Sequence, residues 1–201
     1  MVWHGVCDSI VQEGINLSDE KTLPRITLTD DIIRRLETKN VMLVKSPPMT
    51  GKTSLAALVS RALFEKNSSK NGKITIFNIS LTRWDGSEFT SFTDALKCTF
   101  NISWNAAFTD LPAQGYEVYM VVGEAQVIYQ GRPASSPRLK SAVFWTYVKS
   151  ILCDARSRLR ILLFAAHGSD IQYVRLSTPV RFADPETVME IQHVNFSHSE
   201  V

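Results

Sequence analysis

Residues 41–53 read Val-Met-Leu-Val-Lys-Ser-Pro-Pro-Met-Thr-Gly-Lys-Thr, and this stretch decides the fold. Its first four residues are continuously apolar, which suits a strand buried on both faces. The residues that follow it, 54–64, carry apolar side chains at helical spacing. Between the strand and the helix, Gly51-Lys52-Thr53 supplies the end of the pattern G-x-x-x-x-G-K-[ST]. This order predicts a phosphate-binding loop over 46–53.

The chemistry of such a loop explains its residue types. Gly51 lets the backbone turn tightly and approach a phosphate without a side chain in the way. Successive N–H groups from Met49 to Thr53 converge on phosphate oxygens, supported by the positive end of the helix dipole. Lys52 brings an ammonium to the outer phosphates, and the Thr53 hydroxyl ligates a magnesium ion. The sequence therefore predicts a bound nucleoside triphosphate and Mg²⁺.

Two features of the loop depart from the general pattern. Ser46 stands where the first glycine is expected, and Pro47 and Pro48 lack N–H groups. Both prolines lie on the early limb of the loop, where rigidity is useful and donors are less needed. The segment resembles the G-P-P-G-T-G-K-T loop of AAA+-type ATPases, and the alternative is a chance G-K-T in a strand, turn and helix. The expected nucleotide-binding residues are Ser46, Pro47, Pro48, Met49, Thr50, Gly51, Lys52, Thr53 and Ser54.

A second apolar run, 116–122, has the shape of the strand that ends in Asp-Glu in nucleoside triphosphatases. Gly123 occupies the Asp position, so no carboxylate is available there to steady Mg²⁺ through its water shell. Glu124 is the expected catalytic residue that polarises water, and Gln126 is a candidate to sense or orient the γ-phosphate. Nucleotide binding with weak or absent hydrolysis is therefore the hypothesis. An active Mg²⁺-dependent ATPase using Glu124, or a merely solvated acid at a strand end, are the alternatives.

Two further groups of polar residues are candidates for the site. His167 and Ser169 follow an apolar run at 160–166, where a sensor of the γ-phosphate or a plain turn is expected. Arg156, Arg158 and Arg160 precede that run. They are interpreted either as a solvated helix end or as the source of an arginine finger across a dimer.

The rest of the chain predicts strands that alternate with helices. Continuously hydrophobic strands alternating with helices imply a parallel sheet covered on both faces, a three-layer α/β/α sandwich. The expected helices are 29–36, N-capped by Thr29, then 53–64, 89–100 and 140–158. The expected strands are 41–45, 73–80, 116–122 and 160–166, with further β stretches at 179–182 and 188–194.

Composition places these elements in one domain of ordinary size. The 201 residues are 44% hydrophobic and 21% charged with a net charge of +2, which gives no argument for a nucleic-acid partner. No apolar run is long enough to span a bilayer. Three scattered cysteines, Cys7, Cys98 and Cys153, favour reduced, buried thiols. The expected organisation is an irregular N-terminal extension over 1–24 without a secretory signal, a domain over 25–195 and a tail over 196–201.

Several motifs together resemble the NTPase domain of Crinkler-type effectors of oomycetes and some fungi. That family carries an S-P-P-x-[ST]-G-K-T-S-L loop, a D-E-A-Q-x-x-Y strand end and an F-x-x-Y-G-S-like strand. The matching stretches here are Ser46-Pro-Pro-Met-Thr-Gly-Lys-Thr-Ser-Leu55, Gly123-Glu-Ala-Gln-Val-Ile-Tyr129, Phe144-Trp145 with Lys149, and Leu162-Leu-Phe-Ala-Ala-His-Gly-Ser169.

This resemblance covers residues 25–195. It makes Ser46 normal, whereas Gly123 in place of Asp and His167 in place of Tyr are departures. The resemblance implies a secreted effector that acts in the host nucleus.

Three functions therefore compete. The first is hydrolysis of ATP or GTP coupled to a conformational change. The second is a nucleotide-binding module without turnover that self-associates or docks on a host protein. The third is a decayed protein, and the intact Lys52 and Thr53 argue against it. The missing acid at Gly123 favours the nucleotide-binding module without turnover. ATP is expected as the ligand in preference to GTP.

Overall fold

The computed structural model describes residues 15–68, 72–85, 91–129, 141–154, 157–166, 182 and 184–190. A five-stranded sheet with helices on both faces accounts for most of them. The strands are β1 Val41–Ser46, β2 Ile74–Ser80, β3 Glu117–Gly123, β4 Leu159–Ala166 and β5 Val188–Met189. The helices are α1 Ile26–Lys39, α2 Lys52–Ser68, α3 Leu81–Asp85, α4 Phe92–Phe100, α5 Leu111–Ala113, α6 Gln126–Tyr129 and α7 Ser141–Leu152.

The strands run in the order β2-β3-β4-β1-β5, and every neighbouring pair is parallel. Ser46 of β1 pairs with Ala166 of β4, and Ser80 of β2 pairs with Gly123 of β3. The carboxyl ends of these four strands therefore meet at one edge of the sheet. From β1 the chain crosses to β2 at the far edge of the sheet, past the positions of β4 and β3. In contrast, β5 pairs with β1 on the opposite side from β4. Ligands of open α/β sheets bind outside such a reversal of strand order.

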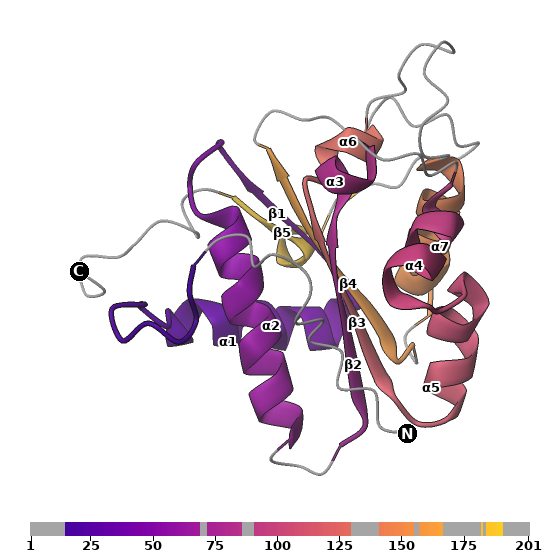
Figure 1. The fold of residues 1–201 in the computed structure, drawn as a ribbon, viewed down its shortest axis with the longest axis horizontal. Helices are drawn as coiled ribbons and strands as arrows, with labels where there is room; N and C mark the ends of the chain where they lie inside the picture. Colours follow the sequence, from indigo (N-terminus) through magenta and orange to yellow (C-terminus); the bar gives the residue numbers. More distant parts are fainter. Residues whose placement is uncertain are drawn as a thin grey trace.

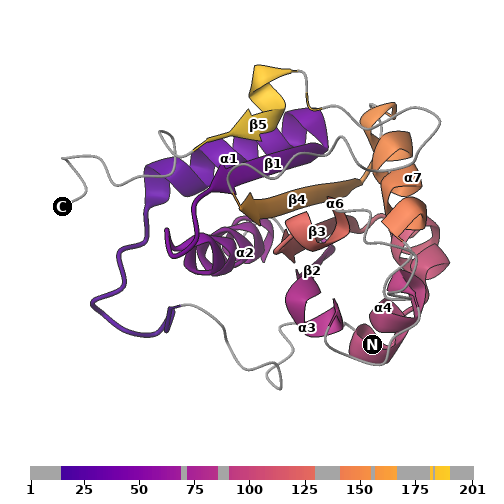
Figure 2. The same cartoon turned by 90° about the horizontal axis from the view of Figure 1, so that it is seen from above.

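Helices cover both faces of the sheet, which gives the three layers that the sequence predicts. Figures 1 and 2 show α1 and α2 on one face and α4, α5 and α7 on the other. Alternate residues of each strand feed the two layers, because successive strand side chains point to opposite faces. In β3, Tyr119 and Val121 pack with α1 and α2, whereas Val118, Met120 and Val122 belong to the opposite core.

Aromatic side chains dominate the core beneath α4 and α7. Trp145 and Phe144 are fully buried, and Phe92 and Trp104 pack on the same cluster. The Phe92 ring lies edge-on to the Trp104 ring, with 4.9 Å between centroids. Such pairs add roughly 0.5–1.5 kcal/mol beyond their buried area. Trp104 and Trp145 thus serve packing.

The predicted helix starts need correction. Thr29 does not cap a helix, because α1 begins at Ile26 and Thr29 lies inside it. Its hydroxyl donates to the carbonyl oxygens of Arg25 and Ile26, the alternative use of threonine inside a helix. In contrast, α4 has a regular cap, since the Ser91 hydroxyl accepts the Asp94 N–H at 3.1 Å. The predicted helix 89–100 therefore starts three residues too early.

Other boundaries also moved. The predicted helix 140–158 is too long, because α7 ends at Leu152 and β4 begins at Leu159. The stretch 106–113, which none of the predicted elements covers, forms a π-helical turn over Ala106–Asp110 that continues into α5. The short helices α3 and α6 were not predicted. At the end of the chain, β5 covers Val188–Met189 of the expected 188–194. The expected 179–182 lies outside the described residues except for Phe182, which is not in a strand.

The prediction of buried thiols is wrong for the two described cysteines. Cys98 and Cys153 are both exposed. Cys98 lies on α4, which turns Ala95, Leu96 and Phe100 into the core and leaves position 98 outside. Cys7 lies outside the described residues. Over the described part of the chain, helices are too short or too polar to cross a membrane.

Candidate phosphate-binding site

The predicted loop lies at the carboxyl end of the sheet, between β1 and α2. The strand ends at Ser46, and the helix begins at Lys52. The Leu55 N–H donates to the Gly51 carbonyl at 2.8 Å and so makes the first bond of the helix. The first N–H groups of a helix have no partner within it, and they carry the positive end of its dipole. These N–H donors therefore lie at the edge of the sheet where the strands end.

Two left-handed residues shape the loop. Gly51 has φ +79°, and a Cβ there would meet no atom of the described residues within 4 Å. The space over Gly51 is therefore open for a ligand to approach the backbone. Met49 has φ +61°, a conformation that costs residues other than glycine energy, and its side chain is completely exposed. The loop tip thus has the form of a glycine-rich turn with one methionine in it.

Lys52 is buried beneath the loop. Its side chain is only 7% exposed, and its ammonium donates to the carbonyl oxygens of Ser46 at 3.1 Å and Pro47 at 2.7 Å. Desolvation by burial lowers the pKa of Lys52 below its usual 10.5, and the negative charge of Glu124 opposes that shift. No carboxylate among the described residues lies within 4.0 Å of the ammonium. An anion at the loop would supply the missing counter-charge.

Ser46 gives the departure from the usual first glycine a structural explanation. Its hydroxyl lies 2.7 Å from the Thr50 hydroxyl, which donates in turn to the Pro47 carbonyl at 2.7 Å. Since the single Thr50 proton is used on that carbonyl, the Ser46 hydroxyl donates to the Thr50 oxygen. Ser46 itself is fully buried. Serine thus ties the loop across its base, and the loop holds its shape through side-chain bonds that glycine could not make.

The end of β3 lies two strands from β1 at the same edge. Gly123 is the last residue of β3, one residue beyond the predicted strand over 116–122. Because Tyr119 and Val121 face α2, alternation places position 123 towards α2 as well. A Cβ on Gly123 would meet the Ile79 carbonyl oxygen at 3.6 Å, an ordinary contact. The backbone could therefore carry an acid here, and the carboxylate is missing only because the residue is glycine.

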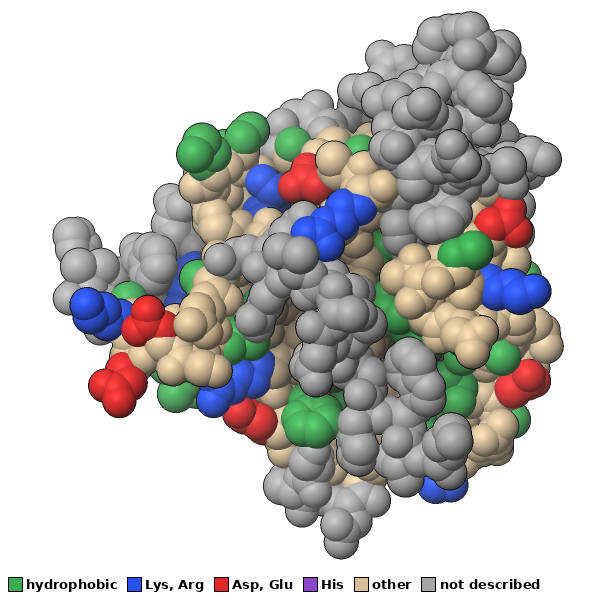
Figure 3. Space-filling view, in the orientation of Figure 1, with side chains coloured by type: hydrophobic (Ala, Val, Ile, Leu, Met, Phe, Trp, Pro, Cys, Tyr) green, Lys and Arg blue, Asp and Glu red, His purple; other side chains and the backbone are tan. Residues whose placement is uncertain are grey.

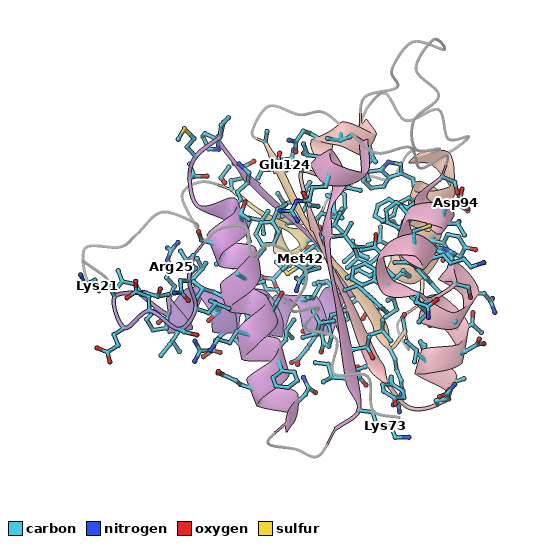
Figure 4. All side chains as sticks on the ribbon, viewed as in Figure 1. Lys21, Arg25, Met42, Lys73, Asp94 and Glu124 are labelled. Carbon is cyan, nitrogen blue, oxygen red and sulfur yellow. The ribbon has the colours of Figure 1, made fainter. Side chains whose placement is uncertain are left out.

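Glu124 follows in a left-handed turn with φ +58°. Its carboxylate accepts a hydrogen bond from the side-chain amide nitrogen of Gln126. The Gln126 amide oxygen accepts the Ala166 N–H of β4 at 3.1 Å. The turn is tied to β4 a second time, because the Ala125 N–H donates to the Phe164 carbonyl at 2.8 Å. Figure 4 shows Glu124 at the carboxyl-end edge of the sheet and Lys73 at the opposite end.

The structure thus brings some of the predicted site residues together and leaves others elsewhere. Residues 46–54 and Glu124 share one edge, and the charge of Glu124 acts on Lys52. His167, Ser169 and Arg156 lie outside the described residues. Arg158 and Arg160 sit at the start of β4, bonded to the Gly115 carbonyl and the Glu117 carboxylate, so they do not form a helix end.

The residues present fit a magnesium nucleotide better than a metal held by protein alone. The Thr53 side chain is exposed in the first turn of α2, where it can reach an ion beside a phosphate. Within the described ranges, no group of three or more His, Cys, Asp and Glu side chains could hold a metal. Mg²⁺ would therefore rest on Thr53, phosphate oxygens and water, without the protein carboxylate that such sites commonly add. Acidic and basic side chains are interspersed on the face seen in Figure 3.

Comparison with known proteins supports the fold. No protein-family model matches the chain, and no curated protein matches it. Among solved structures, the ORC2 protein of Aeropyrum pernix in its ADPNP-ADP complexes superposes with a TM-score of 0.51 at 16% identity. That match covers 74% of this chain and 44% of ORC2, so the chain spans less than half the length of that protein.

Two further structures match less well. The ADP form of the same ORC2 gives a TM-score of 0.45 at 17% identity, covering 74% of this chain and 44% of that one. A chain of the HORMA:CdnC:Trip13 complex of E. coli MS115-1 gives 0.45 at 16%, covering 67% and 44%. The likeness to the first ORC2 structure, together with the all-parallel sheet, defines a P-loop NTPase-like fold. The fold class predicted from the sequence is confirmed.

Sequence reasoning missed two contacts of the site. The Ser46–Thr50 bond had a local signal, since two hydroxyl residues four positions apart flank the prolines. The contact of Gln126 with the Ala166 N–H had none, because the partners lie 40 residues apart and meet only through the strand order.

Proposed function

We propose that the chain binds a nucleoside triphosphate, ATP in preference to GTP, through residues 46–54 with Mg²⁺. The observation that carries the proposal is Lys52, a buried ammonium at the start of α2 that donates only to backbone carbonyls. A cation taken out of water gains most from a full counter-charge. The outer phosphates supply that charge where the helix N-terminus also favours it.

Hydrolysis is proposed to be weak or absent. The support is Gly123, which leaves the edge facing α2 without the acid that would steady Mg²⁺. Glu124 remains as a candidate base for an attacking water, and Gln126 contacts it. These two residues favour a second candidate function, active Mg²⁺-dependent ATP hydrolysis with Glu124 as the base that polarises water.

The wider role is proposed to be that of a nucleotide-dependent interaction module that docks on another protein or on a second copy of itself. A domain over 25–195, with 1–24 and 196–201 flanking it, belongs to this proposal. Secretion, action in a host nucleus and a Crinkler-type effector role rest on the motif resemblance alone. The proposed sensor roles of His167 and Ser169 rest on their position directly after the apolar run 160–166.

Calorimetric titration with ATP and GTP, with and without Mg²⁺, tests the central proposal. Hydrogen bonds to charged groups are worth about 1.5–3 kcal/mol, so Lys52→Ala should weaken ATP binding roughly 10- to 100-fold. Lys66→Ala removes the same charge near the far end of α2, where Lys66 bonds Glu37, and should leave binding unchanged. Absence of binding heat for the unmodified chain under all four conditions would sink the proposal.

A further inference from the structure

The contact between Gln126 and Glu124 lies outside the loop and serves a separate purpose. Both polar atoms of the Gln126 amide are engaged, the nitrogen on the Glu124 carboxylate and the oxygen on the Ala166 N–H. Each partner is fixed independently of Gln126. Ala166 is the last residue of β4 and pairs with Ser46, and the turn at 124–125 is bonded to β4 through Phe164. Gln126 therefore joins two rigid parts of the carboxyl-end edge.

Glu124 is the group that this contact restrains. Its left-handed backbone sets where the side chain starts, and the amide of Gln126 then fixes where the carboxylate ends. The carboxylate lies at the carboxyl-end edge of the sheet, where the loop with Lys52 also lies, and its negative charge opposes the lowering of the Lys52 pKa. An exposed glutamate without such a bond would move among rotamers, and water would screen its charge. Held in place, the charge acts on whatever lies beside Lys52.

We propose that Gln126 is a positioning residue that holds Glu124 as a fixed negative charge at the outer-phosphate end of the loop, so that the site selects magnesium-complexed nucleotide over the free triphosphate. This inference rests on the proposed nucleotide binding. A free triphosphate places its most negative group near Lys52, where the Glu124 carboxylate repels it. A bound Mg²⁺ cancels part of that charge and is itself attracted to the carboxylate. Gln126 thereby acts on specificity without touching the ligand.

The experiment compares calorimetric affinities for ATP and ADP, with Mg²⁺ and with a chelator, across a double-mutant cycle. Glu124→Gln removes the charge. Gln126→Met keeps roughly the volume of the side chain but removes its hydrogen bond to Glu124. Coulomb's law at an effective dielectric constant of about 40–80 makes one unit charge at the edge of such a site worth roughly a two- to fivefold change in affinity. Each variant should bind Mg²⁺-free ATP tighter by that factor. The affinity for Mg²⁺-ATP should change little. The affinity for Mg²⁺-free ADP should change less than that for Mg²⁺-free ATP.

The double variant should show no further gain, because both changes remove the same interaction. Two control variants make the same substitutions away from the site. Glu65→Gln changes an exposed side chain of α2, and Gln114→Met changes an exposed residue at the opposite end of the sheet. A general loosening of the turn would weaken all ligands together, so a selective gain for Mg²⁺-free ATP separates positioning from a structural role. In addition, the amide NMR signals of Gln126 should shift in Glu124→Gln.

Two outcomes overturn the inference while leaving the proposed function intact. In one, Glu124→Gln tightens Mg²⁺-free ATP but Gln126→Met does not. In the other, Gln126→Met weakens every nucleotide equally. If the unmodified chain binds no nucleotide, the proposed function fails and this inference fails with it.

Discussion

The carboxyl ends of β1 and β3 lie at the same edge of one sheet and differ in what they retain. After β1, the loop keeps its left-handed Gly51, its buried Lys52 and the exposed Thr53. After β3, the acid position is Gly123, and Glu124 is held by a neighbouring amide. In the proposed function, the first end supplies the groups that hold the phosphates, and the second lacks one of the two acids that hydrolysis would use.

This difference separates binding from turnover within one site. Phosphate binding draws on backbone amides, a helix dipole and one lysine, all supplied by a continuous stretch of chain. Phosphoryl transfer needs in addition a metal shell and an oriented water, which here depend on a strand two positions away. A change at the end of β3 can therefore remove the second property and spare the first.

Restoring the acid is the change with the largest expected effect. Gly123→Asp should raise Mg²⁺-dependent ATP turnover about 100-fold, since metal positioning stabilises transition-state charge by several kcal/mol. The new Cβ meets only the Ile79 carbonyl oxygen at 3.6 Å, so the fold should tolerate it. Steady-state phosphate release measures the rates.

Gly123→Asn is the matched control for that experiment. It fills the same space without the charge and should leave turnover low. Fast turnover in the unmodified chain, equal to that of the Asp variant, would remove the distinction between the two ends and favour Glu124 as a sufficient base.

The metal dependence of binding gives the next largest effect. Thr53→Ala should weaken Mg²⁺-ATP binding about tenfold while leaving Mg²⁺-free ATP unchanged, because only the metal contact is lost. Thr53→Ser keeps the hydroxyl and should retain most of the affinity. Equal losses with and without Mg²⁺ in the Ala variant would show that Thr53 acts on the phosphates or on the fold instead.

The same contrast explains what the sequence could predict. The position of the loop between β1 and α2 could be predicted, because its signal depends on neighbours such as Gly51 and Lys52 that are adjacent in the chain; its role in binding stays a prediction. The end of β3 could be located to within one residue, since the apolar run ends at Val122 and the strand at Gly123. The role of Gln126 could not be predicted, because its partner at Ala166 is set by the order of β3 and β4 in the sheet.

The predicted start of α1 was wrong for a related reason. Thr29 has the chemistry of a cap, but the same hydroxyl can bond carbonyls of its own helix, and the earlier turn from Ile26 decides between them. Leu28, Ile32 and Leu36 pack α1 on the sheet, and this burial extends the helix beyond its local signal.

The smallest expected effect concerns the conformation of the loop tip. Met49 and Gly51 are both left-handed, but only Gly51 is free of the steric cost. Met49→Gly removes about 1 kcal/mol of backbone strain. The greater entropy of the unfolded chain with glycine offsets about half of this, so the unfolding free energy should rise by about 0.5 kcal/mol. Its side chain is fully exposed, so no packing is lost. Thermal unfolding should rise by roughly 1–2 °C.

Gly51→Ala is the paired variant, and it should move the other way. Nothing lies within 4 Å of the added Cβ, so the cost is that of the backbone conformation, about 1 kcal/mol. That methyl group would also occupy the space through which a phosphate reaches the backbone, so ATP affinity should fall in Gly51→Ala and hold in Met49→Gly. If both variants lose affinity alike, the exposed Met49 side chain takes part in binding, and the loop after β1 would extend its contacts beyond the phosphates.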